Sequence, residues 1–220
     1  MSVSDSVSLL EGTSHRATAL VELYQELENS SAHLPLATQP RDIIPGEGNP
    51  DAAVLLIGEA PGFHEQQERR PFVGRSGKLL RKLLWEAAQL RPEDCYITNI
   101  VKVRPPDNRD PTAEEILAFR PYLNREIRLI QPKLIVTLGR FSMAKFLPNV
   151  KISHLHGRLH KIKWEDSTEY ILPLYHPAAA LRSGKVAEAF REDLAKIPKI
   201  LAWIAENPKD LAQTVYDTLL

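Results

Sequence analysis

The first segment that could do chemistry is residues 58–65, which read Gly-Glu-Ala-Pro-Gly-Phe-His-Glu. The two glycines and the proline favour a tight turn that lets backbone approach a ligand closely. The carboxylates of Glu59 and Glu65 lie in this turn, and either one could orient or polarise a water molecule. An ordinary strand-to-helix turn with surface acids fits the same residues, so the segment alone leaves both interpretations open.

A second segment, residues 70–78, places Phe72 among glycine, proline and several cations. Its Gly77-Lys78 pair resembles part of a phosphate-binding loop, but the first glycine of that motif is absent and Leu79 follows the lysine. An aromatic ring beside cations and a helix start suits stacking on a base and contact with an anionic backbone. The alternative is that Phe72 only anchors the core.

Two further polar residues follow apolar runs. Asn99 offers both a donor and an acceptor, which is what the edge of a pyrimidine requires. His176 stands before Pro177, which suits the first position of a helix, and it could donate a hydrogen bond to a developing anion. Taken alone, Asn99 could equally be a capping residue and His176 a structural one.

Short apolar runs that alternate with amphipathic stretches must position these four segments. The alternation predicts an α/β fold with a mainly parallel sheet, in which ligands bind beyond the carboxyl ends of the strands. Because the four segments follow strands or end them, we expect one shared site. The expected strands are 54–57, 95–98, 134–138, 159–162 and 170–174, and the expected helices are 15–28, 76–88, 141–146, one from Thr112 with Glu115 as a capping box, and 185–206 interrupted at Pro198.

The composition excludes several classes of protein. Lys+Arg and Asp+Glu both number 28 in 220 residues, which argues against a histone-like electrostatic binder. The sequence contains no run of about 18 apolar residues, so it predicts no membrane span. The acidic N-terminus does not resemble a secretory signal. A single cysteine, Cys95, excludes an internal disulfide framework. We therefore expect a soluble cytoplasmic protein.

The expected organisation is a single domain over residues 1–220, with an N-terminal helix in 1–30, a core over 31–206 and a tail over 207–220. The three histidines at 154, 156 and 160 lack convincing zinc spacing, so we expect no metal site. Basic residues cluster before and within the expected helix at 76–88, and they could be either a solvated face or a DNA-binding surface. This cluster comprises Arg69, Arg70, Arg75, Lys78, Arg81 and Lys82, and a second one, open to the same two interpretations, comprises Lys102, Arg104 and Arg109.

In order and spacing, these motifs resemble the family 4 uracil-DNA glycosylases over about residues 30 to 202. Each motif alone is moderate evidence, and the ordered set is specific. The motifs are Gly58-Glu59-Ala60-Pro61-Gly62, Pro71-Phe72-Val73-Gly74 with Gly77, Thr98-Asn99 with Lys102 and Arg104-Pro105-Pro106, and Tyr175-His176-Pro177 with Leu181-Arg182.

The resemblance implies a three-layer α/β/α sandwich and a monomeric, monofunctional enzyme that flips deoxyuridine out of DNA and releases uracil. Glu65, with Glu59 as its rival, would position the attacking water, and His176 would stabilise the departing base. Uracil would contact Gly58, Ala60, Phe72 and Asn99. DNA would contact Arg75, Ser76, Lys102, Pro177, Leu181 and Arg182.

The chain departs from that family at one feature. The family usually holds a [4Fe–4S] cluster on four cysteines, and the corresponding positions here are Ser31, Leu34, Val103 and Phe119. None is a thiolate, so we expect no cofactor and apolar packing in the place of the cluster.

Two rival functions remain open from the sequence. One is a non-catalytic binder of damaged or single-stranded DNA, which the retention of the glutamates, Phe72, Asn99 and His176 disfavours. The other is a glycosylase for a different lesion, such as hypoxanthine or a mismatched base.

Overall fold

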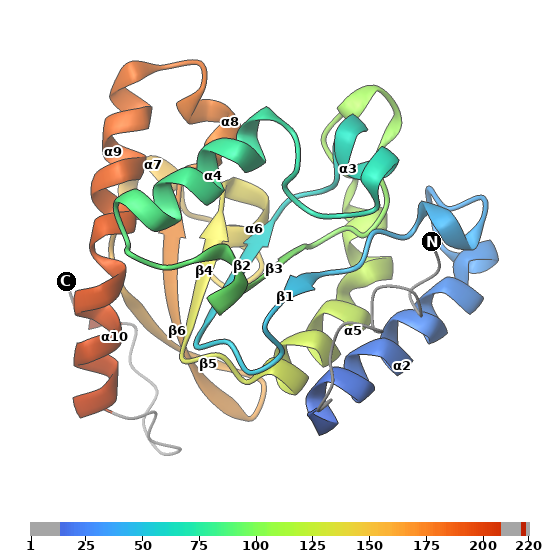
Figure 1. The fold of residues 1–220 in the computed structure, drawn as a ribbon, viewed down its shortest axis with the longest axis horizontal. Coiled ribbons are helices and arrows are strands. Elements are labelled where there is room, and N and C mark those ends of the chain that lie inside the picture. Colours follow the sequence, from blue (N-terminus) through green and yellow to red (C-terminus); the bar gives the residue numbers. More distant parts are fainter. Residues whose placement is uncertain (1–13, 208–216, 219–220) are drawn as a thin grey trace.

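The structure, a computed structural model, describes residues 14–207 and 217–218. Its centre is a seven-stranded sheet in the order β1-β3-β2-β4-β6-β5-β7 (Figure 1). The four central strands are parallel, and the outer pairs β1·β3, β5·β6 and β5·β7 are antiparallel. The strands are β1 Glu47–Gly48, β2 Val54–Gly58, β3 Cys95–Asn99, β4 Leu134–Leu138, β5 His160–Trp164, β6 Ser167–Leu174 and β7 Asp217–Thr218.

The central strands β2, β3 and β4 are buried along their whole length, as mainly apolar strands of a parallel sheet should be. Their register pairs Gly58 with Asn99, and Leu138 of β4 with Leu174 of β6. The carboxyl ends of β2, β3, β4 and β6 therefore meet at one edge of the sheet. The expected α/β fold with a mainly parallel sheet is confirmed.

Helices cover both faces of the sheet, which makes three layers (Figure 1). The chain moves from β2 through α4 to β3 on one side, and from β3 through α5 back past β2 to β4 on the other. Because such crossovers are right-handed, the two connecting helices must lie on opposite faces. One apolar core joins α2 and α5 to the sheet, and a second joins α4, α9 and α10 to its other face.

The helix boundaries agree closely with the expected ones. Thr112 caps α5, since its hydroxyl accepts the Glu115 N–H while the Glu115 carboxylate accepts the Thr112 N–H. The expected long C-terminal helix divides at Lys196, and Pro198 lies in the first turn of its second half. The helices are α2 His15–Asn29, α3 Phe63–Glu68, α4 Arg75–Glu86, α5 Ala113–Ile130, α6 Arg140–Ala144, α7 Ile152–Leu155, α8 Pro177–Ala180, α9 Gly184–Ala195 and α10 Ile197–Glu206.

Some expectations missed detail. The connection at 31–50 contains two short 3-10 helices and the edge strand β1, and the turn at 58–65 continues into α3. The N-terminal helix is present from His15, whereas most of the expected tail, and the first 13 residues, lie outside the described residues. In the described part of the chain, no helix is both long and apolar enough to cross a membrane.

Candidate active site

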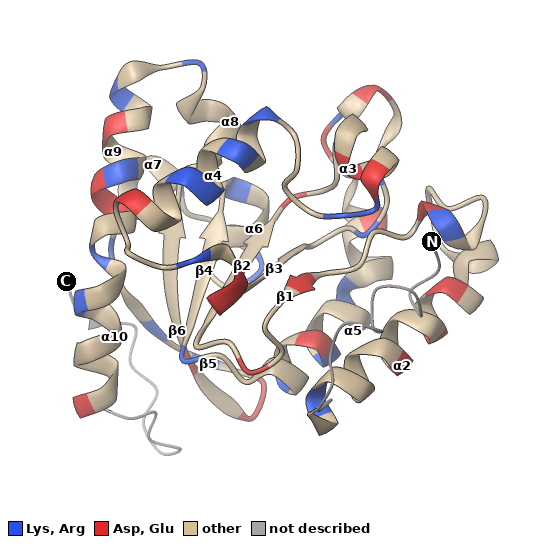
Figure 2. Ribbon diagram, in the orientation of Figure 1, with Lys and Arg blue, Asp and Glu red and all other residues tan. Residues whose placement is uncertain are grey.

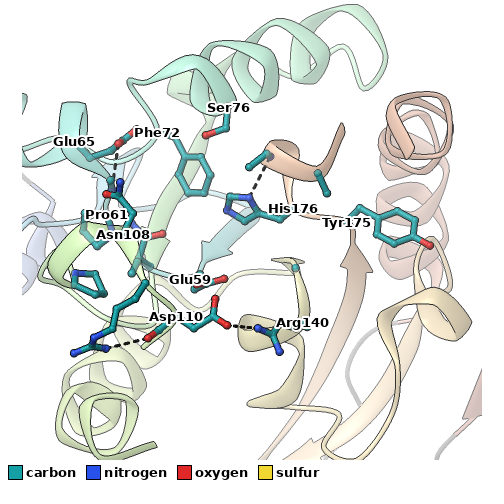
Figure 3. A pocket seen from close by; sticks show the side chains of 18 of the residues that line it. Glu59, Pro61, Glu65, Phe72, Ser76, Asn108, Asp110, Arg140, Tyr175 and His176 are labelled. Carbon is teal, nitrogen blue, oxygen red and sulfur yellow. Dashed lines mark hydrogen bonds and ion pairs between the residues drawn. The ribbon is translucent and has the colours of Figure 1, made fainter. Parts of the chain in front are cut away.

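A cavity of about 660 Å³ opens at the carboxyl edge of the sheet (Figure 3). All four central parallel strands contribute to it, through Glu59 after β2, Asn99 at the end of β3, Arg140 after β4 and His176 after β6. The structure thus brings together the segments that the sequence placed after separate strands. The expected site residues that line it are Glu59, Ala60, Glu65, Phe72, Ser76, Asn99, His176 and Arg182.

The Glu59 side chain is half-buried in the cavity, and its carboxylate has no hydrogen-bond partner among the described residues. The pKa of Glu59 is raised to about 7, chiefly by burial and also by the nearby Asp110 carboxylate, while the Arg140 guanidinium opposes both effects. Asp110 and Arg140 form an ion pair beside it (Figure 3). A carboxylate with this pKa and free oxygens can position a water and take a proton from it near neutral pH.

The Glu65 carboxylate is differently occupied. Its Oε1 accepts the N–H groups of Val73 at 3.0 Å and Gly74 at 2.8 Å, and its Oε2 accepts the Gly62 N–H at 3.2 Å. Glu65 is buried, so these bonds join the start of α3 to the turn that carries Phe72. Its oxygens are therefore already engaged in holding this loop.

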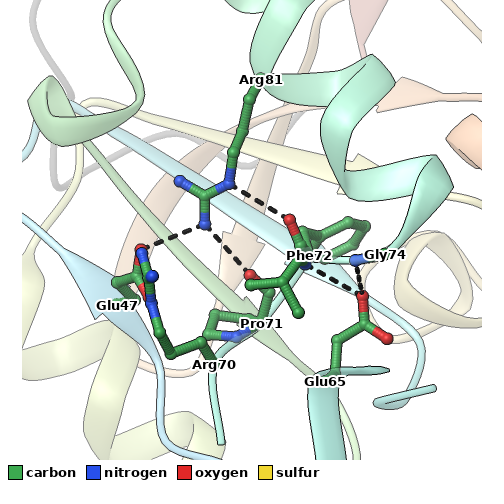
Figure 4. Close-up of polar contacts among 8 residues, drawn as sticks. Glu47, Glu65, Arg70, Pro71, Phe72, Gly74 and Arg81 are labelled. Carbon is green, nitrogen blue, oxygen red and sulfur yellow. Dashed lines mark hydrogen bonds and ion pairs between the residues drawn. The ribbon is translucent and has the colours of Figure 1, made fainter. Parts of the chain in front are cut away.

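The backbone of Phe72 has a left-handed φ of 53°, which is unusual for an aromatic residue. Several contacts hold it there (Figure 4). Arg81 donates from Nε to the Phe72 carbonyl at 3.2 Å and from its guanidinium to the Pro71 carbonyl at 3.1 Å. A Cβ at Gly77 would lie 1.9 Å from the same Phe72 carbonyl, so this position requires glycine. These contacts fix the Phe72 ring at the cavity wall.

The Asn99 side chain is 4% exposed, and its Oδ1 has no hydrogen-bond partner in the described protein. An unpaired buried amide oxygen costs free energy, so such an atom in a cavity points to a ligand that supplies the donor. A Cβ at Gly58 would lie 2.3 Å from this oxygen and 2.5 Å from the Phe72 ring. Glycine at 58 therefore allows the ring and the amide to converge.

The His176 imidazole faces Phe72, with ring centroids 6.0 Å apart (Figure 3). Burial, reinforced by the Arg182 cation, lowers the pKa of His176 to about 4, so the ring is neutral at neutral pH. Its Nδ1 accepts the Ala178 N–H at 3.2 Å. The ring proton must then reside on Nε2, which makes His176 a neutral hydrogen-bond donor.

Residues 45–197 match the family model described as the uracil DNA glycosylase superfamily. The chain belongs to this superfamily. It is 43% identical over 162 residues to the type-4 uracil-DNA glycosylase of Sulfurisphaera tokodaii, covering 71% of this chain and 74% of that protein. It is 43% identical to the Saccharolobus solfataricus type-4 enzyme over 74% of this chain and 77% of the relative. For the Thermotoga maritima type-4 enzyme the identity is 38%, over 80% and 92%.

One expected DNA contact of this superfamily member is wrong. Lys102 is 1% exposed, and its ammonium donates to the Glu126 carboxylate at 2.5 Å and to the Thr98 hydroxyl. The Tyr24 hydroxyl donates to the same carboxylate, so this buried group ties α2 and α5 to β3. Burial lowers the pKa of Lys102 and its partner Glu126 opposes that shift. Lys102 therefore braces the strand that ends in Asn99.

Of the other expected DNA contacts, Ser76 and Arg182 line the cavity, and Arg75 and Leu181 are their sequence neighbours. Arg75 and Arg182 are exposed, Leu181 is 43% exposed, and Ser76 is half-buried. Pro177 is buried at the start of α8, so it shapes the turn after His176 rather than presenting a surface.

Basic residues lie along α4 (Figure 2), but several cations of the cluster form ion pairs. Arg69 pairs with Glu28, whereas Arg70 and Arg81 both pair with Glu47 of β1 (Figure 4). Arg70 and Arg81 thereby hold the edge strand against the Phe72 loop. The exposed Arg75 and Lys78, at the start of α4, are better placed to meet a phosphate backbone.

The positions that correspond to the cluster ligands of type-4 glycosylases do not fit an iron–sulfur cluster. Val103 and Phe119 are 1% and 0% exposed in the apolar core beneath α5, and Leu34 packs against that core. Ser31 is buried with a hydroxyl in place of a thiolate. Cys95 lies in the core on the opposite face of the sheet, where burial raises its pKa to about 12. These residues supply no thiolate, and a cluster of this type is held by four.

Sequence reasoning missed several residues that line the cavity, among them Asn108, Asp110 and Arg140. Arg140 could have been found, because it follows β4 through Gly139 and the end of a parallel strand marks this edge of the sheet. Gly139 has a φ of 96°, and a Cβ there would lie 3.0 Å from the Cβ of His176. Asn108 and Asp110 belong to a loop whose path no local pattern indicates.

Proposed function

We propose that this protein is a monofunctional uracil-DNA glycosylase, which flips deoxyuridine out of DNA and hydrolyses its N-glycosidic bond. The observation that carries the proposal is the unpaired, buried Oδ1 of Asn99 in a cavity shared with Phe72 and His176. Stacking surface, amide and neutral donor together match the face and the polar edge of a pyrimidine. The names of the type-4 relatives support the same substrate.

In the bound state the uracil ring stacks on Phe72. The Asn99 Oδ1 accepts the uracil N3–H, and the amide nitrogen donates to O4. The backbone of Gly58 and Ala60, at the end of β2, lies beneath the ring. Because the fixed Phe72 backbone and the glycine at 58 set this spacing, the protein reorganises little when the base enters.

In the chemical step the bond between C1′ and N1 breaks, and its electron pair moves onto the uracil ring. The His176 Nε2–H donates to uracil O2 as negative charge develops there. The sugar becomes cationic, and Glu59 stabilises that cation and directs a water to C1′. Glu59 takes the proton from this water as the new C–O bond forms, which leaves an abasic site and the uracil anion. Solvent then protonates the anion to give free uracil, and Glu59 returns its proton to solvent. Glu65 supports the step by holding the Phe72 loop.

The proposal is tested by incubating the protein with oligonucleotides that contain uracil, hypoxanthine or a T:G mismatch, followed by alkaline cleavage of abasic sites. Cleavage of the uracil substrate with release of free uracil is expected. Cleavage of only another substrate would reassign the lesion, whereas binding without any cleavage would support the non-catalytic alternative.

The pH dependence of kcat/KM should follow Glu59. Glu59 can accept a proton only in its ionised form, and its pKa is about 7. The ratio kcat/KM should therefore rise with pH up to about that value and then level off. His176, with a pKa of about 4, changes charge well below this window. A pH profile of kcat/KM on uracil-containing DNA measures the effect. A flat profile across about pH 6 to 8 would contradict the role of Glu59.

We also propose that the protein works without an iron–sulfur cluster, with Leu34, Val103 and Phe119 packed in the region that the cluster ligands would occupy. The apolar burial of these side chains supports this. Protein purified without oxygen should show no broad visible absorption band and no stoichiometric iron. About four irons per chain would overturn the proposal.

On the DNA side, we propose that Leu181 enters the space left by the flipped nucleotide and that Arg75, Ser76 and Arg182 contact the backbone. The place of Ser76 and Arg182 in the cavity lining and the exposure of their neighbours Arg75 and Leu181 support these roles. The expected monomeric state and cytoplasmic location stay predictions, for size-exclusion chromatography and cell fractionation to test.

A further inference from the structure

Two exposed apolar side chains, Phe63 and Leu181, are sequence neighbours of residues that line the cavity. Leu181 follows α8, and Phe63, the first residue of α3, is 51% exposed. Figure 1 shows α3 and α8 on opposite sides of the carboxyl edge of β2. Gly62, the neighbour of Phe63, lines the cavity, although the Phe63 side chain itself does not.

The Phe63 ring is held by a cation that is itself fixed. The guanidinium carbon of Arg104 lies 5.3 Å from the ring centroid. Arg104 donates to the Asn108 Oδ1 at 2.8 Å and to the Gln66 Oε1 at 3.1 Å. The His64 ring meets Phe63 edge-on, with centroids 5.5 Å apart. These contacts limit the motion of an exposed aromatic, so little side-chain entropy is lost when a ligand stacks on it.

This arrangement differs from ordinary exposure of an apolar side chain, which is common and needs no explanation. Trp85, at the far end of α4, is 59% exposed and has no aromatic or cation contact among the described residues. Phe63 instead combines exposure, a fixed cation and a place beside the cavity. Asn108 lines the cavity and also binds Arg104, so the ring is coupled to the cavity wall.

We propose that Phe63, backed by Arg104, is a stacking platform for the nucleobase next to the one that enters the cavity. The inference rests on the proposed function, since it needs a flipped nucleotide in a DNA strand. Bases stack on aromatic side chains regardless of their sequence, and a cation behind the ring strengthens such contacts. Leu181 would then fill the space that the flipped nucleotide leaves, and Phe63 would support a base beside that space.

The test compares Phe63→Ala, Phe63→Leu and Phe63→Tyr with the unaltered protein on an oligonucleotide with a central uracil. The alanine and leucine variants should raise KM, and the Kd from fluorescence anisotropy, by about tenfold with little change in kcat. The tyrosine variant should behave as the unaltered protein does, because it keeps the aromatic face. Trp85→Ala serves as the matched control for loss of an exposed aromatic and should change neither constant.

Shortened substrates separate stacking from a general effect on the loop. With oligonucleotides that end at the uracil on the 5′ or on the 3′ side, one of the two should abolish the difference between Phe63→Ala and the unaltered protein. An unchanged KM and Kd for Phe63→Ala on the full substrate, or an equal defect on both shortened substrates, would overturn the inference. Absence of uracil release by the unaltered protein would instead count against the proposed function, and the anisotropy comparison would still decide whether Phe63 binds DNA.

Discussion

Replacing Glu59 by glutamine should lower kcat for uracil release by about 10³-fold, with KM and Tm close to those of the unaltered protein. Glutamine keeps the shape of the side chain but can neither accept a proton nor carry the negative charge that stabilises a cationic sugar. Because the carboxylate makes no hydrogen bond within the described protein, the substitution breaks no contact that stabilises the fold. Single-turnover kinetics on a uracil-containing oligonucleotide measures the loss.

The matched control is Glu65→Gln, which changes the other carboxylate of the same segment. Its amide nitrogen would face backbone N–H groups that now donate to the carboxylate, at a cost of about 1–3 kcal/mol. We expect a lower Tm and a less firmly held Phe72 loop. The rise of kcat/KM with pH up to about pH 7 should remain, because Glu59 is unchanged. If Glu65→Gln abolishes catalysis at an unchanged Tm while Glu59→Gln remains active, the roles of the two glutamates are reversed.

The central sheet was predictable from sequence because its physics is local. Residues 54–57 are apolar at every position and residues 134–138 at every position except Thr137, and only a strand covered on both faces buries such a run completely. The edge strand β1 has two residues and no period, and arginines from other segments hold it in place through Glu47. A two-residue strand that depends on distant cations leaves no pattern in its own sequence.

The site was predictable to the extent that its residues follow strands. Glu59, Asn99 and His176 come from three strands whose parallel order brings them to one edge. The fate of Lys102 was not predictable, because its partner Glu126 lies 24 residues away on a helix whose rotation is set by the whole core. A lysine within a basic segment suggests DNA, and only tertiary packing turns it inward.

The roles of Glu59 and Glu65 also could not be told apart from the sequence, because tertiary packing sets them. Their positions in one short segment made them equivalent in the sequence. They differ because α3 begins between them and turns Glu65 towards the backbone of the Phe72 loop, whereas Glu59 remains in the cavity.

Replacing Asn99 by alanine should lower kcat/KM for uracil release by about 10²–10³-fold, because the pyrimidine edge loses the donor and the acceptor that orient it. The same substitution removes a buried oxygen that has no partner in the described protein, so Tm should stay the same or rise. Kinetics on a uracil-containing oligonucleotide and thermal unfolding measure the two effects.

Thr137→Val is the matched control for this substitution. The Thr137 hydroxyl on β4 is also buried without a partner among the described residues, but it does not line the cavity. Valine there should leave uracil release unchanged and keep or raise Tm. If Asn99→Ala loses activity but keeps its stability, and Thr137→Val keeps both, then the unpaired Asn99 amide serves the ligand and does not stabilise the fold. An unchanged rate for Asn99→Ala would break the assignment, and a fall in Tm would mean that the amide has a structural partner after all.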